Sequence, residues 1–263
     1  MKISIIGAGN MGSAIALGLR GNSQINGLEI CCADLIPEKL RKMKEMNASI
    51  EVTTDNLLAV NGADIVIIAV KPWLVETIIN EVKEALDYEH LILVSIAAGI
   101  DFFQLSRYLQ KEDGKLPAIF RIVPNTAITV KESVNFIANC NATQTQFDLI
   151  HQMFSDLGYT IHIEEQLIPA CTALSSCGIA FAFRYIRAAV AGAVELGIHH
   201  ELAQKIETQT LRGAITLLES NNSHPEAEID KVTTPGGITI KGLNAMEEAG
   251  FTNAVIKGLK SSV

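Results

Sequence analysis

Three glycines near the start of the sequence have a spacing that can do chemistry. Gly7, Gly9 and Gly12 form G-x-G-x-x-G directly after a short apolar run and at the start of a helical pattern. In that context the first glycine permits a tight turn, the second lets a pyrophosphate approach the backbone, and the third packs helix on strand. The phosphates then face the free N–H groups and the positive end of the helix. The sequence therefore predicts a dinucleotide-binding turn here.

An acidic residue follows this turn at a distance that fits the same chemistry. Asp34 lies 22 residues after Gly12, at the end of the next apolar run. A carboxylate there accepts hydrogen bonds from the ribose hydroxyls of NAD and repels the 2′-phosphate of NADP. Asp34 therefore favours NADH, and NADPH stays open as the alternative because Lys39 and its neighbours are basic. A second interpretation is that Asp34 caps the helix that starts at Pro37.

A second glycine-rich turn lies near the carboxyl end of the sequence. Pro235-Gly236-Gly237 predicts a tight turn whose backbone N–H groups point outward where a helix starts. Such a turn binds a carboxylate without an arginine. Thr239, in the first helical turn, can offer its hydroxyl to a ring nitrogen beside that carboxylate. The alternative is a glycine-rich helix entry in which Thr234 or Thr239 acts as a cap.

Alternating strands and helices must position the first of these turns. Apolar runs of four to six residues alternate with helical patterns over roughly the first 160 residues. The predicted strands are Lys2–Ile6, Leu28–Cys32, Asp64–Ala69, Leu91–Ile96, Ala118–Ile122, Val134–Ala138 and Thr160–Ile163. The predicted helices are Met11–Arg20, Pro37–Met46, Trp73–Ala85, Phe102–Leu109 (capped by Asp101) and Thr145–Leu157. This rhythm predicts an α/β fold, a Rossmann-like doubly wound parallel sheet covered on both faces.

The rhythm changes after residue 163. Long helical patterns at Ala170–Leu196, His200–Ser220 and Ile238–Ala249 need no strand between them. We therefore expect a dinucleotide-binding domain at residues 1–163 and an all-α substrate and dimerisation domain at residues 164–263. The second part is dense in Ala, Gly and Ser and too apolar to stand alone, so we expect a homodimer or a larger assembly built from dimers.

Composition narrows the classes of partner. A net charge of −8 argues against a nucleic-acid or anionic-membrane surface. Five cysteines without C-x-x-C and six histidines without a paired spacing argue against a disulfide framework and a metal site, and they fit a reducing cytoplasm. The uncharged run Leu167–Phe183 is 17 residues long. Because a span needs roughly 20 residues, we expect a buried helix there instead.

Four stretches together resemble one enzyme family. They are Gly7-Ala8-Gly9-Asn10-Met11-Gly12, Ala69-Val70-Lys71-Pro72, Arg121-Ile122-Val123-Pro124-Asn125-Thr126 and Thr233-Thr234-Pro235-Gly236-Gly237-Ile238-Thr239-Ile240. In this order they resemble the motifs of pyrroline-5-carboxylate reductases, and the last is similar to the signature S-P-G-G-x-T of that family. The resemblance implies hydride transfer from NAD(P)H to the cyclic C=N of 1-pyrroline-5-carboxylate, which is the last step of proline biosynthesis.

The resemblance also implies roles for single residues. Thr239 is the catalytic residue that hydrogen-bonds the imine nitrogen. The residues that hold the substrate are Thr234, Gly236, Gly237 and Ile238. The residues that bind the cofactor are Gly7, Ala8, Gly9, Asn10, Met11, Gly12, Asp34, Asn56, Ala69, Val70, Lys71, Pro72, Ser95, Ala97 and Asn125.

Several positions depart from the family pattern. Ser176 and Ile179 stand where the family usually has Gly and Pro, and Val123 and Ala127 stand where it has Met and Pro. The segment Glu228-Ile229-Asp230 stands where the family usually reads L-K/R-D, so the cation of that motif is lost. These departures leave two alternatives open: an NAD(P)H-dependent reductase of another cyclic imine, or a dinucleotide-sensing relative without turnover. The sequence points to no dedicated carboxylic or imidazole proton donor.

Overall fold

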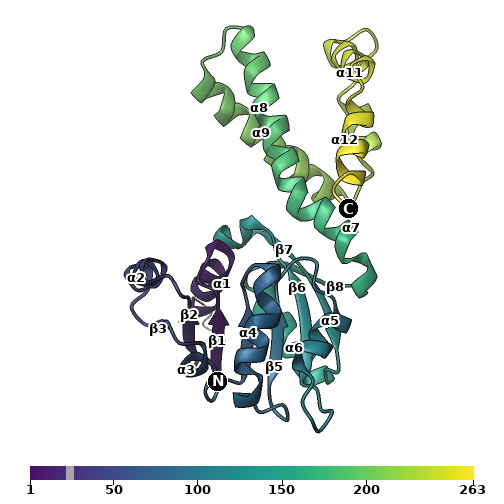
Figure 1. The fold of residues 1–263 in the computed structure, drawn as a ribbon. Helices are drawn as coiled ribbons and strands as arrows, with labels where there is room; N and C mark the ends of the chain where they lie inside the picture. The colour runs from purple at the N-terminus through teal and green to yellow at the C-terminus, as the bar shows by residue number, and fades with distance from the viewer. Residues whose placement is uncertain (22–26) are drawn as a thin grey trace. The chain divides into compact units, whose positions relative to one another are not determined.

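The computed structural model describes residues 1–21 and 27–263, which form two compact units, Met1–Thr172 (unit 1) and Ala173–Val263 (unit 2). Unit 1 holds an eight-stranded sheet of order β3-β2-β1-β4-β5-β6-β7-β8 (Figure 1). Its strands are β1 (Lys2–Ile6), β2 (Glu29–Ala33), β3 (Glu51–Thr53), β4 (Ile65–Ile68), β5 (Ile92–Ser95), β6 (Ala118–Val123), β7 (Ser133–Cys140) and β8 (Gly158–His162). The α/β fold class and every predicted strand are confirmed. The sequence patterns missed β3, which has only three residues at the sheet edge.

One end of the sheet reverses direction. The strands from β3 to β6 pair in parallel, whereas β7 pairs antiparallel with β6 and parallel with β8. The connection from β6 to β7 is residues 124–132 and contains only the short 3₁₀ helix η3 (Thr126–Val130). A crossover to a parallel neighbour needs about a dozen residues or more. The short connection therefore makes β7 turn back on β6.

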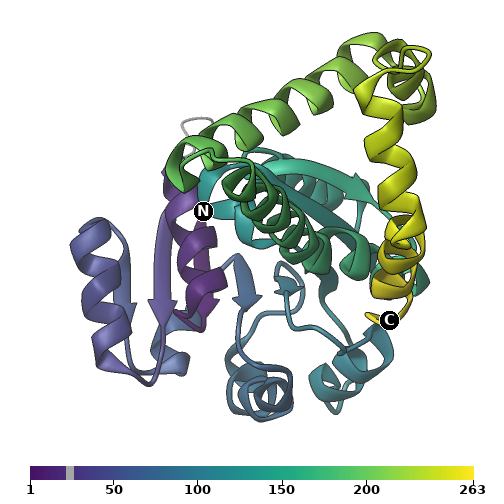
Figure 2. The same cartoon turned by 90° about the horizontal axis from the view of Figure 1, so that it is seen from above.

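Helices cover both faces of the sheet in unit 1, as predicted. One face carries α1 (Asn10–Arg20), α2 (Pro37–Met46) and α6 (Gln144–Ser155), and the other carries α3 (Asn56–Val60), α4 (Val75–Val82) and α5 (Phe102–Leu109). Figure 2 shows α2 beside the strands at the β3 end of the sheet. Because successive strand residues point to opposite faces, Ile67 belongs to the first core and Ile68 to the second. Full burial of one such side chain stabilises the fold by about 1.5–3 kcal/mol.

Local signals begin two of these helices as the sequence predicts. Pro37 is the first residue of α2, where its missing N–H costs nothing. Asp101 caps α5: its carboxylate accepts the Gln104 N–H at 2.8 Å, and the Gln104 side chain accepts the Asp101 N–H at 3.2 Å. A cap of this kind contributes about 1 kcal/mol.

Short 3₁₀ and α-helical turns fill the remaining connections of unit 1. They are η1 (Pro72–Leu74), η2 (Lys83–Ala85), η4 (Glu165–Leu167) and α7 (Ile168–Thr172). The predicted helix Trp73–Ala85 is therefore a series of η1, α4 and η2. The division between the units falls after Thr172, whereas the domain boundary expected from the sequence falls after residue 163.

Unit 2 is helical. Its elements are the π-helical turn η5 (Ala173–Cys177), α8 (Gly178–Glu195), α9 (His200–Asn221), α10 (Pro225–Lys231), α11 (Ile238–Glu248) and α12 (Phe251–Lys260). α8 packs along α9, α10 contacts α9, and α12 contacts both α11 and η5 (Figures 1 and 2). Ser176 lies in η5 and Ile179 in α8, so the helix passes through both family departures without a break. The short helices α10 and α12 were not predicted.

The helix α8, which contains the carboxyl-terminal part of the uncharged run Leu167–Phe183, is exposed within a single chain. α8 contains no buried residue, and Phe183 is among its exposed aromatic side chains. By length and composition alone the helical stretch Glu165–Glu195 is long and apolar enough to cross a membrane, and 11% of its apolar window is buried. The expected burial of this helix is therefore not provided by its own chain. An apolar pattern records that a face must be covered, not which chain covers it.

An ion pair between a buried arginine and a half-buried glutamate joins β6 to the segment after β8 in unit 1. The Arg121 side chain is 7% exposed, and its Nη1 donates to Glu165 Oε1 at 2.7 Å. The same oxygen accepts the Phe102 N–H at 2.7 Å. Sequence patterns missed this pair because its members are 44 residues apart. Glu165 thereby fixes both the start of α5 and a buried charge.

We expect Glu165→Ala to lower the free energy of unfolding by about 2–3 kcal/mol, because it leaves the Arg121 charge buried without its partner. Urea unfolding followed by circular dichroism measures the loss. The double variant Arg121→Met/Glu165→Ala should recover part of it, since no buried charge remains. Glu164→Ala, at the exposed neighbour, is the control and should stay close to wild type. Equal stability of Glu165→Ala and wild type would contradict this role.

Candidate functional site

The predicted cofactor residues gather at one edge of the sheet in unit 1. Because β1 to β6 are parallel, their carboxyl ends share an edge, and ligands of such sheets bind there. At this edge lie Gly7, Ala8, Gly9, Asn10, Met11 and Gly12 after β1, Asp34 after β2, Asn56 after β3, Ala69, Val70, Lys71 and Pro72 after β4, Ser95 and Ala97 at β5, and Asn125 after β6. The topology thus brings together all fifteen predicted positions (Figure 1).

The glycine turn after β1 is closely packed on one side and open on the other. A Cβ on Gly7 would lie 2.5 Å from the Ala69 carbonyl oxygen, and one on Gly12 would lie 1.9 Å from the Gly7 carbonyl oxygen. Gly7 also has a φ of +110°, which L side chains rarely adopt. A Cβ on Gly9 would meet nothing within 4 Å in the described structure. The space over Gly9 suits a pyrophosphate.

The amino end of α1 faces this open space. Gly9 is the N-cap residue, and no side chain among residues 1–21 and 27–263 caps the helix. The first N–H groups of a helix have no partner within it. An anion such as a phosphate can therefore accept them. The residues present fit a dinucleotide.

Asp34 reaches the glycine turn and does not cap α2. Its side chain is 9% exposed, and Oδ2 accepts the Ala8 N–H at 2.9 Å. Oδ1 accepts the Ile36 N–H at 2.9 Å, and the ammonium of Lys39 lies 2.9 Å from Oδ2. The N-cap residue of α2 is Ile36, for which the described chain provides no side-chain cap. The helix-cap interpretation of Asp34 is wrong, and its carboxylate lies beside the turn expected to hold the dinucleotide.

Two asparagines at the same edge hold its loops. The side-chain amide of Asn56 donates to Glu81 Oε2 at 3.0 Å, which ties the start of α3 to α4. Asn125 Oδ1 accepts the Ala127 N–H at 3.0 Å and caps η3. Lys71, by contrast, is exposed. The predicted cofactor contacts of Asn56 and Asn125 would come in addition to these structural hydrogen bonds.

The second glycine-rich turn, in unit 2, closes on itself. The Gly237 N–H donates to the Thr234 carbonyl at 2.9 Å, and Gly236 has a φ of +72°. With Pro235 before it, this is the pattern of a type II turn. The expectation that the glycine N–H groups all point outward is therefore wrong for Gly237. A Cβ on Gly237 would lie only 2.6 Å from Thr234 Oγ1, so this position keeps room for that hydroxyl.

The start of α11 offers donors directly after this turn. Gly237 is its N-cap residue, and neither Thr234 nor Thr239 caps the helix. Ile238 and Thr239 are the first two helical residues, and both are exposed. Their N–H groups precede the first intrahelical hydrogen bond and can bind an anion. The hydroxyl of Thr239 stands beside them on the same exposed turn.

The two groups of predicted residues therefore belong to different units. Unit 1 brings together the positions expected to bind the cofactor, and unit 2 brings together Thr234, Gly236, Gly237, Ile238 and Thr239. Among the described residues no three His, Cys, Asp or Glu side chains form a cluster that could hold an ion.

Glu228, in the segment where the family motif has lost its cation, accepts a hydrogen bond from the nearby Lys231. Its Oε1 lies 2.6 Å from the Lys231 ammonium and also accepts from Asn221 and Ser223. The hydrogen bond from Lys231 lowers the pKa of the Glu228 carboxyl from its ordinary value. The departure therefore creates a local ion pair on α10, just before the glycine-rich turn.

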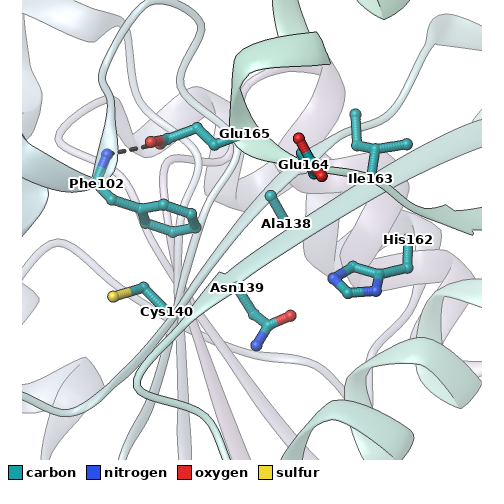
Figure 3. A pocket seen from close by; sticks show the side chains of 8 residues that line it. All are labelled: Phe102, Ala138, Asn139, Cys140, His162, Ile163, Glu164 and Glu165. Carbon is teal, nitrogen blue, oxygen red and sulfur yellow. Dashed lines mark hydrogen bonds between the residues drawn. The ribbon is translucent and has the colours of Figure 1, made fainter.

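A pocket of about 510 Å³ lies elsewhere on unit 1 (Figure 3). It is lined by Phe102, Ala138, Asn139, Cys140, His162, Ile163, Glu164 and Glu165. None of these is a predicted site residue, and Glu165 is already engaged by Arg121 and the Phe102 N–H. The volume of a pocket therefore does not identify the cofactor site in this chain, because a phosphate-binding turn lies in the open at an edge of the sheet.

Both units of the chain are similar in sequence to known protein families. Residues 165–263 match the family described as "Pyrroline-5-carboxylate reductase dimerisation", and residues 2–99 match that described as "NADP oxidoreductase coenzyme F420-dependent". A Dictyostelium discoideum protein named pyrroline-5-carboxylate reductase 1 is 39% identical over 99% of this chain, which spans 48% of that relative. The Methanosarcina acetivorans pyrroline-5-carboxylate reductase is 36% identical over 99% of this chain and 96% of its own length.

Solved structures agree with these relatives. A 1-pyrroline-5-carboxylate reductase from Streptococcus pyogenes superposes with a TM-score of 0.88 at 27% identity, covering 100% of this chain and 96% of that chain. The similarity extends over both units, from the glycine turn after β1 to α12. The chain therefore belongs to the pyrroline-5-carboxylate reductase family.

Proposed function

We propose that this chain reduces 1-pyrroline-5-carboxylate to L-proline with NAD(P)H, the last step of proline biosynthesis. The observation that carries this proposal is the exposed, uncapped start of α11, where backbone donors and the Thr239 hydroxyl lie together. A ring imine that carries a carboxylate needs one anion-binding group and one hydrogen-bonding group side by side. Membership of the family supports the same substrate.

The chain's own residues bind and orient the substrate in this proposal. The carboxylate accepts the N–H groups of Ile238 and Thr239, with Gly236 and the Thr234 hydroxyl completing the site. Because the Gly237 N–H is engaged by Thr234, Gly237 contributes shape rather than a donor. Thr239 Oγ1 hydrogen-bonds the ring nitrogen. Holding the ring at two points fixes the C=N carbon for reaction.

The reduction then balances without a further acid. The cofactor, when bound, supplies the hydride. The ring nitrogen enters protonated, the C=N carbon gains the hydride, and the π electrons of the C=N bond become the nitrogen lone pair. Thr239 Oγ1 accepts the ring N–H and thereby keeps the nitrogen oriented.

NAD(P)H binds at the sheet edge of unit 1 in this account, with the pyrophosphate over Gly9 and the adenosine ribose at Asp34. We propose that the other predicted positions, among them Ala69, Ser95 and Asn125, contact the nicotinamide half of the cofactor. We infer a preference for NADH, because the Asp34 carboxylate suits ribose hydroxyls better than a 2′-phosphate.

The exposed apolar faces of unit 2 support self-association. Phe183 on α8 and Ile256 on α12 are exposed in the single chain. Apolar surfaces of this kind mark interfaces. We infer a homodimer, or an assembly built from dimers, that works in the cytoplasm without nucleic-acid or membrane partners.

Thr239→Val should lower kcat/KM for 1-pyrroline-5-carboxylate by about 100-fold, because the hydroxyl acts on the reacting ring. Thr239→Ser keeps the hydroxyl and should lie within about tenfold of wild type. Initial rates of cofactor oxidation measure both. The Kd for NAD⁺ should not change in either variant. Wild-type turnover by Thr239→Val would contradict the proposed role.

Asp34→Asn should reduce the ratio of kcat/KM with NADH to kcat/KM with NADPH by at least about tenfold. The reason is that ribose hydroxyls form stronger hydrogen bonds with a charged carboxylate than with a neutral amide. The measurement is steady-state kinetics with each cofactor at saturating imine. Asp55→Asn, at the cap of α3, is the control and should keep the wild-type ratio. An unchanged ratio in Asp34→Asn would remove Asp34 from cofactor selection.

Light scattering on the purified chain should give at least twice the 28.4 kDa of one copy, because the apolar faces of α8 and α12 must be covered. A mass of 28.4 kDa at micromolar concentration would contradict self-association.

A further inference from the structure

The carboxylate of Asp34, the proposed ribose-binding residue, already forms an ion pair with a lysine. Lys39 Nζ lies 2.9 Å from Asp34 Oδ2 and 3.3 Å from Oδ1, so the ammonium contacts both oxygens. The Lys39 side chain is 40% exposed, whereas that of Asp34 is 9% exposed. The pair thus lies at the surface of the sheet edge, with the more exposed partner, Lys39, on the solvent side.

The contacts of Asp34 use its whole accepting capacity. A carboxylate has about four acceptor positions. Two are taken by backbone donors, the N–H groups of Ala8 and Ile36, both at 2.9 Å. The ammonium of Lys39 takes the other two. The backbone donors are held by the turn and by the start of α2, so only Lys39 can move away when ribose hydroxyls arrive.

The neighbouring cations of α2 are committed to acids of their own helix. Arg41 donates to both Glu38 and Glu45, and Lys42 lies 3.8 Å from Glu38. The hydrogen bond from Arg41 lowers the pKa of the Glu38 carboxyl from its ordinary value. Lys39 differs because its partner is the predicted ribose-binding residue itself.

We propose that Lys39 modulates the NADH preference that Asp34 sets, acting on NADH and NADPH in opposite directions. For NADH, the ammonium competes with the ribose hydroxyls for Asp34 and weakens binding. For NADPH, the same ammonium offsets the negative charge of Asp34 and turns to the 2′-phosphate, which strengthens binding. The inference rests on the proposed dinucleotide site, but not on which imine the enzyme reduces.

The test is the equilibrium binding of NAD⁺ and NADP⁺ to the full-length protein by titration calorimetry, without substrate. We expect Lys39→Met to raise the Kd for NADP⁺ about tenfold and to lower the Kd for NAD⁺ about threefold. Lys39→Arg keeps the cation and should retain NADP⁺ binding within about threefold. Lys42→Met removes a cation from the same helix and should change both constants by less than about twofold.

A double variant separates the two effects. In an Asp34→Asn background, Lys39→Met should still weaken NADP⁺ binding but should no longer improve NAD⁺ binding, because the competition for the carboxylate is gone. Equal changes for both cofactors, or no change for either, in folded Lys39→Met protein would overturn the proposal. If the wild-type chain bound neither dinucleotide, the proposed function would fail as well. Cofactor binding without imine turnover would contradict only the proposed substrate.

Discussion

The close approach of the glycine turn to the strand beside it is the constraint on which the site depends. Gly7 and Gly12 have no room for a Cβ, because the backbone of the turn and Ala69 fill that space. The turn therefore holds the start of α1 between β1 and β4. In the strand order β3-β2-β1-β4-β5-β6, the chain builds outward on one side of β1 up to β3 and then continues on its other side with β4. Open parallel sheets bind ligands at such a switch point, so packing and function meet at the same residues.

Electrostatics at this edge follow from the same turn. The Ala8 N–H fixes the Asp34 carboxylate beside the glycines, and the carboxylate in turn holds the Lys39 ammonium. A backbone constraint thus determines where a negative charge and a positive charge stand. The chemistry at the second turn is separate: Gly236 and Gly237 shape a closed turn that leaves the first donors of α11 uncapped. Each unit presents a helix start without a side-chain cap, and we propose that the one in unit 1 binds a pyrophosphate and the one in unit 2 a small carboxylate.

Local patterns were enough to predict elements whose signals lie within a few residues. α2 and α5 begin and end where Pro37, Asp101 and the apolar periodicity indicate. The reversal at β7 was not predicted, although the short connection at residues 124–132 that causes it can be read from the sequence. The glycine turn after β1 was predictable because the spacing of its three glycines lies within six residues, although its packing against Ala69 is long-range.

Interactions between distant residues were out of reach. The buried Arg121 and the half-buried Glu165 form an ion pair across 44 positions, and no periodicity records it. The sequence left a helix cap as a second interpretation of Asp34, and only the hydrogen bond from the Ala8 N–H places its carboxylate at the glycine turn. The prediction that the Gly237 N–H points outward was wrong. The N–H of a turn residue can close the turn or face a ligand, and here its hydrogen bond to the Thr234 carbonyl closes the turn. The apolar character of α8 was clear, but its residues within a single chain do not say what covers it.

The central claim is that a hydride passes from the nicotinamide to the C=N carbon of a ring imine that carries a carboxylate. The most direct measurement is to incubate the wild-type protein with NADH deuterated at the transferable position of the nicotinamide and with 1-pyrroline-5-carboxylate, and to analyse the product by mass spectrometry and NMR. The account predicts L-proline with one deuterium on the ring carbon that was double-bonded to nitrogen. Unlabelled proline, or no proline from protein that binds the cofactor, would contradict it.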